Sequence, residues 1–494
     1  MGHDHVATDP SHWANVATGS RLRCGAMTDV THLDISRTRE AIVTGAVKAG
    51  AVAEAALERI AALDPRFNAF SVVLADDARQ EAFARDQQLA GGEAPGPLHG
   101  VPVAIKEEID VAGCVTTFGG EANSTPAGAD AEVVRRLREA GAVIVGKTTM
   151  PEFGAFPYTE SVSRGITRNP WDPSRTPGGS SGGTAVAVAT GMVAVGLGGD
   201  GGGSIRIPSA CCGLFGLKPQ RGRVTTAPHP HLWWALGTAG PLTRSVLDSA
   251  IVYDVIRGNV DGDLYRAGES GSFVEAAGRE PGRLRIGWSA KPVTLGVRPD
   301  PLHVEALDET VRLLQDLGHD VREVDPRYPD PTPAFVPQFF AGIRSEADAV
   351  DHYDRLERRT RETCRMGAWV TPRVREWALA RTEQVSAKAN RIFEQVDVLL
   401  TPAIAHRPPA VGILGGRGTV SSALAAMPAI AYAALWNVAG NPAASVPCGI
   451  GPDGLPTAVQ LVGRTDDETT LLSLSAQIEA ARPFPSWTAP TVKS

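Results

Sequence analysis

The sequence predicts an α/β protein in which parallel strands form the centre of the fold and helices cover both faces. Apolar segments of strand length alternate with segments of helical periodicity along most of the chain. Residues 101–105 and 142–146 are apolar throughout, which is typical of strands buried on both faces. With 43% hydrophobic and 21% charged residues over 494 positions, the chain falls in the range of ordinary globular proteins.

The first half of the chain predicts two helices followed by a repeated alternation of strand and helix. Apolar positions recur with helical spacing over 35–64 and pause near Gly50, which indicates two helices joined by a turn. The elements expected next are a strand over 68–74, a helix over 76–89, a strand over 101–105, a helix over 131–140 and a strand over 142–146. A segment rich in turn residues, 166–183, then precedes a buried helix after Thr184 and a buried strand over 192–196.

The second half continues the alternation without a low-complexity linker or an internal repeat. The expected elements are strands over 284–288, 320–324, 396–400, 445–447 and 457–462, and helices over 301–317, within 341–394 and over 468–480. We therefore expect one domain over 27–494, with N-terminal helices over 35–64, a core over 98–250 and the rest of the sheet and its helical cover over 251–494. Residues 1–26 are polar and lack the features of a secretory signal. They are expected to form a flexible extension, unless Met27 is the true start.

Charge and cysteine content exclude several classes of protein. The formal net charge is −7, so we expect no binding to nucleic acid. The arginine-rich stretch 355–391 also carries glutamates at helical spacing and is expected to be a solvated helix surface. Six cysteines without C-x-x-C spacing favour a reduced, cytoplasmic protein. The longest apolar stretches, 184–199 and 423–436, fall short of the ~20 residues that span a bilayer, so no membrane segment is expected.

Two glycine-dense segments are the first candidates for a functional site. Residues 178–183 read Gly-Gly-Ser-Ser-Gly-Gly, and residues 196–204 read Gly-Leu-Gly-Gly-Asp-Gly-Gly-Gly-Ser. Glycine permits positive φ and close backbone approach, so such a turn can direct several N–H groups at one point. That arrangement suits an anion or an oxyanion.

Two other kinds of site share parts of these patterns. Gly196-x-Gly198-x-x-Gly201 fits the dinucleotide-binding fingerprint, which requires a helix to begin directly after it. Residues 204–208 (Ser-Ile-Arg-Ile-Pro) are β-branched and contain Pro, so we expect no helix there and disfavour this site. Gly178-x-Ser180-x-Gly182 fits the nucleophile elbow of α/β-hydrolases, but that motif follows a strand, and here a proline-rich loop precedes it.

Lys106 at the end of the apolar segment 101–105 provides a possible base. Most lysines at the end of a strand are solvated, but burial disfavours the charged form of a lysine, and a neutral lysine can activate a serine hydroxyl. A second serine between the two can relay the proton. Two serines, one lysine and a ring of glycine N–H groups would form acyl-transfer machinery without a histidine. Glycines that only shape turns are the structural alternative, which leaves the two serines and Lys106 unexplained.

The histidines offer no competing site. Eleven His residues are scattered along the chain, and none of them forms H-E-x-x-H or another metal-ligand spacing. We therefore expect no metal and no cofactor.

In several segments the sequence resembles the amidase signature family of serine hydrolases. The matching segments are 98–106 (Leu-His-Gly-Val-Pro-Val-Ala-Ile-Lys), 178–183, 200–208 (Asp-Gly-Gly-Gly-Ser-Ile-Arg-Ile-Pro), 212–219 (Cys-Gly-Leu-Phe-Gly-Leu-Lys-Pro), 240–245 (Gly-Pro-Leu-Thr-Arg-Ser) and 440–447 (Gly-Asn-Pro-Ala-Ala-Ser-Val-Pro). The resemblance covers nearly the whole chain after Met27. It implies a large, twisted mixed sheet of about eleven strands with helices on both faces.

The resemblance also implies roles for individual residues. Ser204 corresponds to the nucleophile, Ser180 to a bridging serine that follows a cis peptide bond, and Lys106 to the base. The implied oxyanion hole consists of the backbone N–H groups of Gly201, Gly202, Gly203 and Ser204. Supporting roles fall to Ser181 and to Asp200 and Arg206, the last two as an ion pair.

The implied activity is hydrolysis of a carboxylic amide to an acid and an amine through a covalent acyl-enzyme, by a monomer or homodimer acting on a small molecule. Bulky residues near the motifs suggest apolar or aryl amides, with carbamates and esters as further candidates. The candidate pocket residues are Phe153, Phe156, Tyr158, Gly179, Trp233, Trp234 and Trp436. A core position is the alternative for each aromatic residue.

An amidotransferase subunit that hydrolyses glutamine and acts on aminoacyl-tRNA with partner subunits is the alternative function. The chain length and the run 165–172 (Gly-Ile-Thr-Arg-Asn-Pro-Trp-Asp) also fit that branch of the family. Two positions depart from the commoner pattern: Glu107 stands where many members have Asp, and Gly201 stands where amidotransferase subunits usually have Thr. The missing basic patch and Gly201 favour a stand-alone amidase.

Overall fold

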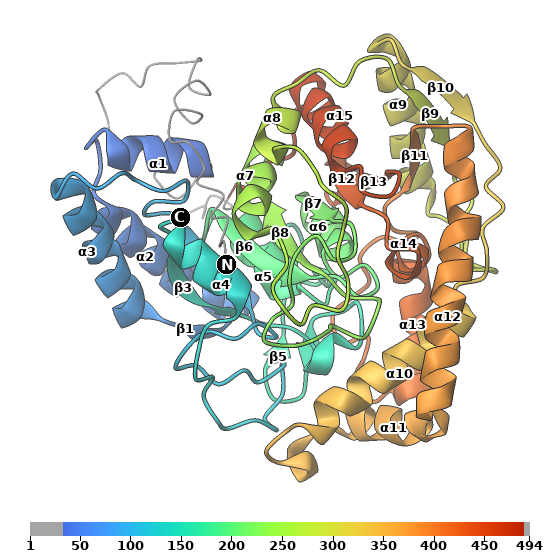
Figure 1. Cartoon of the computed structure of the whole chain (residues 1–494), viewed down its shortest axis with the longest axis horizontal. Coiled ribbons are helices and arrows are strands. Elements are labelled where there is room, and N and C mark those ends of the chain that lie inside the picture. Colours follow the sequence, from blue (N-terminus) through green and yellow to red (C-terminus); the bar gives the residue numbers. More distant parts are fainter. Residues whose placement is uncertain (1–32, 489–494) are drawn as a thin grey trace.

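Eleven strands form one mixed sheet at the centre of the computed structural model, which describes residues 33–488 (Figure 1). The order across the sheet is β1-β3-β2-β6-β8-β7-β12-β13-β11-β9-β10. The bounds are β1 Phe70–Val73, β2 Pro102–Lys106, β3 Val143–Thr148, β6 Val195–Gly199, β7 Phe215–Lys218, β8 Ala239–Thr243, β9 Arg285–Trp288, β10 Asp320–Glu323, β11 Val398–Pro402, β12 Ala443–Ile450 and β13 Pro456–Val462. Two short strands, β4 (Glu160–Ser161) and β5 (Gly165–Ile166), pair separately. The implied mixed sheet of about eleven strands is confirmed.

Helices lie on both faces and at both ends of this sheet. Their bounds are α1 Ile35–Val43, α2 Ala49–Phe67, α3 Ala75–Ala90, α4 Glu132–Glu139, α5 Gly182–Ala189, α6 Arg206–Cys212, α7 Val246–Ile256, α8 Phe273–Ala277, α9 Pro301–Asp316, α10 Thr332–Asp348, α11 Arg358–Met366, α12 Pro372–Ala389, α13 Thr419–Ile430, α14 Ala434–Ala439 and α15 Glu468–Ala481. Figure 1 shows α1 to α3 at one end of the molecule and α10 to α12 at the other. The extension expected over 1–26 lies outside the described residues.

The sheet contains two groups of parallel strands separated by an antiparallel middle, and β1 at one edge is antiparallel to β3. β2 is parallel to both β3 and β6, and β9 is parallel to both β10 and β11. Between these two groups, β8, β7, β12 and β13 pair in antiparallel fashion. The all-parallel arrangement expected from the alternation is therefore wrong for the middle of the sheet. β12 and β13 are joined by a short turn through Asp453 and Gly454, and only antiparallel strands can be joined so closely.

The apolar core lies on both faces of the sheet. In β2, Val103 and Ile105 belong to one hydrophobic cluster, together with residues of α4, α7, α9 and α15. Ala104 points to the opposite face and belongs to a second cluster, with residues of α2, α3, α5 and α6. Because both faces of the strand are covered, residue 106 at its end is buried with it.

Two predicted elements near the second glycine segment differ from the structure. The buried strand expected over 192–196 is β6, Val195–Gly199, which runs into the glycines themselves. The helix α6 begins at Arg206, where no helix was expected. Pro208 lies in the first turn of this helix, where its missing N–H removes no helical hydrogen bond. The side chain of Asp200 accepts hydrogen bonds from the N–H groups of Ile205 and Arg206 and so stabilises the helix start.

Across residues 33–488, the helices are too short or too polar to cross a lipid bilayer.

Candidate active site

The C-terminal ends of two parallel strands bring the predicted catalytic residues to one edge of the sheet. β2 pairs with β6 so that Ile105 lies opposite Leu197. Lys106 is the last residue of β2, and Ser204 lies in the loop between β6 and α6. Ser180 lies just before α5, in the loop expected from the turn residues. All three side chains line one small cavity.

Lys106 and Ser180 are in direct contact. The Lys106 Nζ donates a hydrogen bond of 2.9 Å to the Ser180 Oγ, and the Gly179–Ser180 peptide bond is cis. Lys106 is 1% exposed, Ser180 2% and Ser204 8%. No hydrogen bond joins the side chains of Ser180 and Ser204 among the described residues, although catalytic contacts in an enzyme without substrate are often long. The structure therefore brings the three predicted residues together and connects two of them.

Ser181 holds the loop of Ser180 against the end of β6. Its Oγ donates to the Gly199 carbonyl at 3.2 Å and accepts from the Gly199 N–H at 3.4 Å. Its own N–H donates to the Ser204 carbonyl at 3.3 Å. The predicted supporting residue thus links the two serine loops.

A buried ion pair fixes the loop that carries Ser204. Asp200 and Arg206 form two hydrogen bonds, from Nη2 to Oδ1 at 2.9 Å and from Nε to Oδ2 at 3.0 Å. Asn437 of α14 donates to Asp200 Oδ1 at 2.8 Å, and the Arg206 Nη1 donates to Gln460 at 2.9 Å. Burial alone would raise the pKa of Asp200, but Arg206 and Asn437 hold it well below its usual range. The carboxylate therefore stays charged at neutral pH.

The Asp200 carboxylate argues against a dinucleotide-binding site at the second glycine segment. A helix does follow the glycines, so the expectation of no helix at this point was wrong. The start of α6 is occupied instead by the Asp200 carboxylate, which is bonded to the N–H groups of Ile205 and Arg206. A pyrophosphate would need those same donors and would be repelled by the charge.

The predicted oxyanion donors are not equivalent. The Gly203 N–H donates a hydrogen bond to Asp200 Oδ1 at 2.7 Å. It is therefore already bonded within the protein and, contrary to its predicted role, is not free to bind a substrate oxygen. The N–H groups of Gly201, Gly202 and Ser204 make no hydrogen bond to the residues that the structure describes. These three donors are therefore the ones available to a substrate oxygen.

Two acidic side chains at this cavity were not singled out from the sequence. Glu108 Oε1 lies 3.0 Å from the Lys106 Nζ, and Glu346 of α10 also lines the cavity. Burial and the nearby Glu108 raise the pKa of Glu346 well above its usual range, and Trp233 and Lys106 offset only part of this effect. Glu108 lies in the turn only two residues after Lys106, so its closeness in sequence to the candidate base carried a signal. Glu346 comes from a distant helix and carried none.

Trp233 is the predicted pocket residue that reaches the cavity. A Cβ atom added at Gly201 would lie 2.8 Å from its ring, and one added at Gly342 of α10 would lie 2.6 Å from it. The indole is therefore held between the candidate oxyanion segment and α10. Its backbone φ of 50° is unusual for a bulky residue and indicates that the surrounding packing determines its position.

The other predicted pocket residues lie elsewhere. Phe153, Phe156, Tyr158 and Trp436 are buried in hydrophobic clusters and do not line the cavity. Trp234 lines a different depression and stacks on Arg375, whose guanidinium carbon is 4.1 Å from the ring centre. Gly179 forms the cis peptide bond before Ser180. Proximity in sequence to the glycine motifs therefore did not bring these aromatic side chains to the site.

Glu107, unlike its neighbour Glu108, does not line the cavity, and both of its carboxylate oxygens have partners elsewhere in the protein. It accepts hydrogen bonds from the side chain of Ser71 and from both the N–H and the hydroxyl of Thr117, and lies 3.6 Å from the Lys147 Nζ. The departure from Asp at this position is accommodated by these partners.

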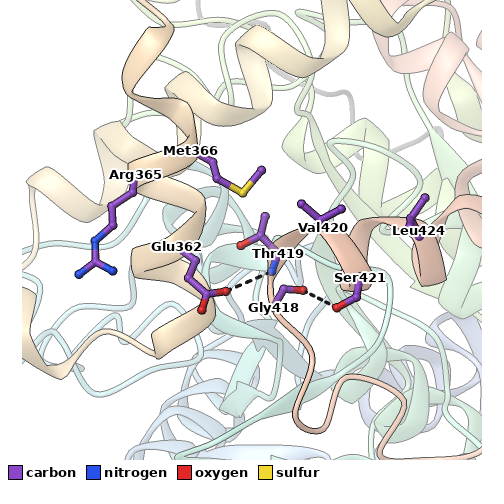
Figure 2. Close-up of a pocket in the computed structure, with 8 residues that line it drawn as sticks. All are labelled: Glu362, Arg365, Met366, Gly418, Thr419, Val420, Ser421 and Leu424. Atoms are coloured by element: carbon purple, nitrogen blue, oxygen red, sulfur yellow. Dashed lines mark hydrogen bonds between the residues drawn. The ribbon is translucent and has the colours of Figure 1, made fainter.

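A second depression, between α11 and α13, carries no comparable chemistry (Figure 2). Its carboxylate, Glu362, accepts a hydrogen bond from the Thr419 N–H, and the Ser421 hydroxyl donates to the Gly418 carbonyl. Exposed Val420 and Leu424 make the remainder apolar. Ser421 is bonded to a backbone carbonyl and not to Glu362, so we assign no reaction to this surface.

Comparison with known proteins places the chain in a family. The family model described as Amidase matches residues 51–472. The chain is 48% identical over 460 residues to the putative amidase AmiB2 of Mycobacterium tuberculosis (strain ATCC 25618 / H37Rv), with 92% of this chain and 98% of that protein covered. It is 36% identical over 485 residues to a glutamyl-tRNA(Gln) amidotransferase subunit of Roseiflexus castenholzii (strain DSM 13941 / HLO8), covering 90% and 95%.

A solved structure shows the same fold. The structure of 6-aminohexanoate cyclic dimer hydrolase in complex with its substrate superposes with a TM-score of 0.86 at 30% identity, covering 92% of this chain and 98% of the other. The family model, the relatives and the fold all indicate the same family. The chain therefore belongs to the amidase signature family, and it is an enzyme that hydrolyses amide C–N bonds.

Proposed function

We propose that this enzyme acts through a Ser204–Ser180–Lys106 relay and a covalent acyl-enzyme. The contact between the Lys106 Nζ and the Ser180 Oγ, in the cavity that Ser204 also lines, is the observation that supports this mechanism best. The serine is weak as a nucleophile by itself and needs such a base.

The proposed reaction has two steps. In the first, Ser204 Oγ attacks the amide carbonyl while its proton passes through Ser180 to Lys106, which acts as the base, and the same route returns the proton to the departing amine. In the second, the relay takes a proton from water, which attacks the ester carbonyl and releases the acid and free Ser204. The N–H groups of Gly201, Gly202 and Ser204 receive the negative charge that forms on the carbonyl oxygen in both steps.

We propose apolar or aryl amides as substrates, with carbamates and esters as further candidates. Leu232 and Trp233 provide apolar surface at the cavity that holds the serines. Aromatic walls with few polar anchors are the usual composition of sites for such groups. We further propose a cytoplasmic monomer or homodimer.

The amidotransferase function is the second candidate, because a protein of that kind is 36% identical to this chain. The contact between Trp233 and Gly201 argues against it. A threonine at position 201, as expected in that branch, would place its Cβ 2.8 Å from the Trp233 ring. The Trp233 side chain thus packs in a position that only glycine at residue 201 leaves open.

Hydrolysis of a panel of aryl anilides, carbamates and glutamine by the purified single chain tests the proposal. We expect turnover of anilides or carbamates and complete loss of turnover in Ser204→Ala, with an unchanged circular dichroism spectrum. Ammonia release from glutamine alone, or activity only after partner subunits are added, would favour the amidotransferase. Unchanged turnover in Ser204→Ala would refute the assignment of the nucleophile.

A further inference from the structure

A larger cavity adjoins the one that holds the serines. It has a volume of about 370 Å³ and shares Leu232, Trp233 and Glu346 with the small cavity that Ser204 lines. Glu346 therefore lies at the junction of the two spaces. A substrate whose carbonyl reaches Ser204 has room to extend past Glu346 into this cavity.

The lining of the larger cavity is acidic. It includes Asp110, Glu346 and Asp351 together with His229 and His231, and none of its described lining residues is Lys or Arg. Hydrogen bonds from the Ser124 and Thr125 N–H groups hold the pKa of Asp351 at about 2, so this side chain is charged at neutral pH. Carboxylates on low-dielectric walls concentrate cations in a cleft.

Asp110 and Asp351 have partners inside the protein, but Glu346 has an oxygen without one. The Asp110 carboxylate accepts from the Thr116 hydroxyl at 2.6 Å, and its Oδ2 lies 3.6 Å from the His229 Nε2. The Trp233 side chain makes a hydrogen bond to the Glu346 carboxyl group. The Oε2 of this group is buried and has no hydrogen-bond partner among the described residues. Its acidic neighbour, Glu108, is paired with Lys106 instead. A buried polar atom without a partner in a native protein requires an explanation, and a ligand that donates hydrogen bonds provides one.

The same junction carries aromatic surface. Trp233 lines both cavities, and Phe118 lines the larger one. An indole face and a carboxyl group at one place suit an alkylammonium group. Burial raises the pKa of Glu346 in the absence of a ligand, and the positive charge of a bound ammonium group would favour its ionised form.

We propose that the Glu346 carboxylate and Trp233 bind a positively charged amino group of the substrate, so that the preferred amides carry an ammonium group separated from the scissile carbonyl by an apolar chain. This inference rests on the proposed amide hydrolysis at Ser204 and specifies its substrate class. The ammonium group donates to the unpartnered oxygen of Glu346, and its alkyl chain lies along Leu232 and Trp233.

Matched substrates test this specificity. We compare an ω-aminoacyl p-nitroanilide with the n-alkanoyl p-nitroanilide of equal chain length, and an N-(ω-aminoalkyl) amide with the corresponding N-alkyl amide, all at neutral pH. We expect kcat/KM to be at least roughly tenfold higher for the ammonium member of at least one pair. In Glu346→Gln this preference should fall by about 10- to 100-fold, the usual effect of losing a hydrogen bond to a charged group.

Asp348→Asn provides the matched control, because it removes the same charge from an exposed position of α10. It should leave the ratio between paired substrates unchanged. For the wild-type enzyme, n-butylammonium should compete with a neutral anilide more strongly than 1-butanol does, which tests the proposal independently of any variant.

The outcomes separate the two proposals. Hydrolysis of neutral anilides that depends on Ser204, without preference for either ammonium substrate, would overturn the inference and leave the proposed mechanism intact. An equal preference in wild type and Glu346→Gln, or no advantage of butylammonium over butanol, would also overturn it. Failure of all amides in the panel would refute the proposed function itself.

Discussion

At the scale of single residues, the contact between Gly201 and Trp233 constrains the site. A Cβ at position 201 would come within 2.8 Å of the indole, so Gly201→Ala must displace either the ring or the peptide N–H beside the nucleophile. We predict that kcat falls toward the 10²–10³-fold loss known for a missing oxyanion donor, with thermal stability nearly unchanged. Steady-state kinetics of Gly201→Ala and of Gly201→Ala/Trp233→Leu test this. The smaller side chain should restore part of the activity, and full activity of Gly201→Ala would contradict the role.

At the scale of elements, the start of α6 depends on one buried carboxylate. Asp200 binds Arg206 and the N–H groups of Gly203, Ile205 and Arg206. Asp200→Asn leaves the buried Arg206 uncompensated, and we predict a loss of about 3–5 kcal/mol in the free energy of unfolding. Asp172→Asn is the control, since its pair with Arg175 is exposed and 3.8 Å long, and such pairs contribute at most about 1 kcal/mol. Urea unfolding measures both, and equal effects would contradict the role of Asp200.

The elements also show what the sequence could and could not predict. The segments that carry Lys106, Ser180 and Ser204 follow regular patterns, because glycine runs and apolar strands mark loops at a sheet edge. The contribution of α10 was not predictable, although Phe335, Gly342 and Glu346 share one of its faces. Helical spacing shows which residues share a face, but not which distant element they pack against. Likewise, α6 escaped prediction because its stabilising partner, Asp200, lies outside the helix.

At the scale of the whole molecule, buried carboxyl groups make stability depend on pH. Burial raises the pKa of Asp248 to about 7, with a further contribution from Asp34, and burial raises the pKa of Glu479 to about 7. Between about pH 4 and 7 the native state then binds more protons than the unfolded state, so the stability from these groups is present at low pH and lost as pH rises. Asp248 accepts from the Ile35 N–H at 3.0 Å, which connects α7 to α1. We predict that Tm falls less between pH 5 and pH 8 in Asp248→Asn than in wild type, as differential scanning fluorimetry measures. A steeper fall in the variant would contradict this.

The proposed mechanism depends on a covalent bond to Ser204, and locating that bond is its sharpest test. The purified enzyme is treated with an aryl fluorophosphonate, digested, and analysed by mass spectrometry. We predict a single adduct on Ser204, greatly slowed labelling in Lys106→Ala, and no adduct in Ser204→Ala. An adduct on Ser180 or Ser181 in the wild-type enzyme, or labelling that survives in Ser204→Ala, would contradict the mechanism.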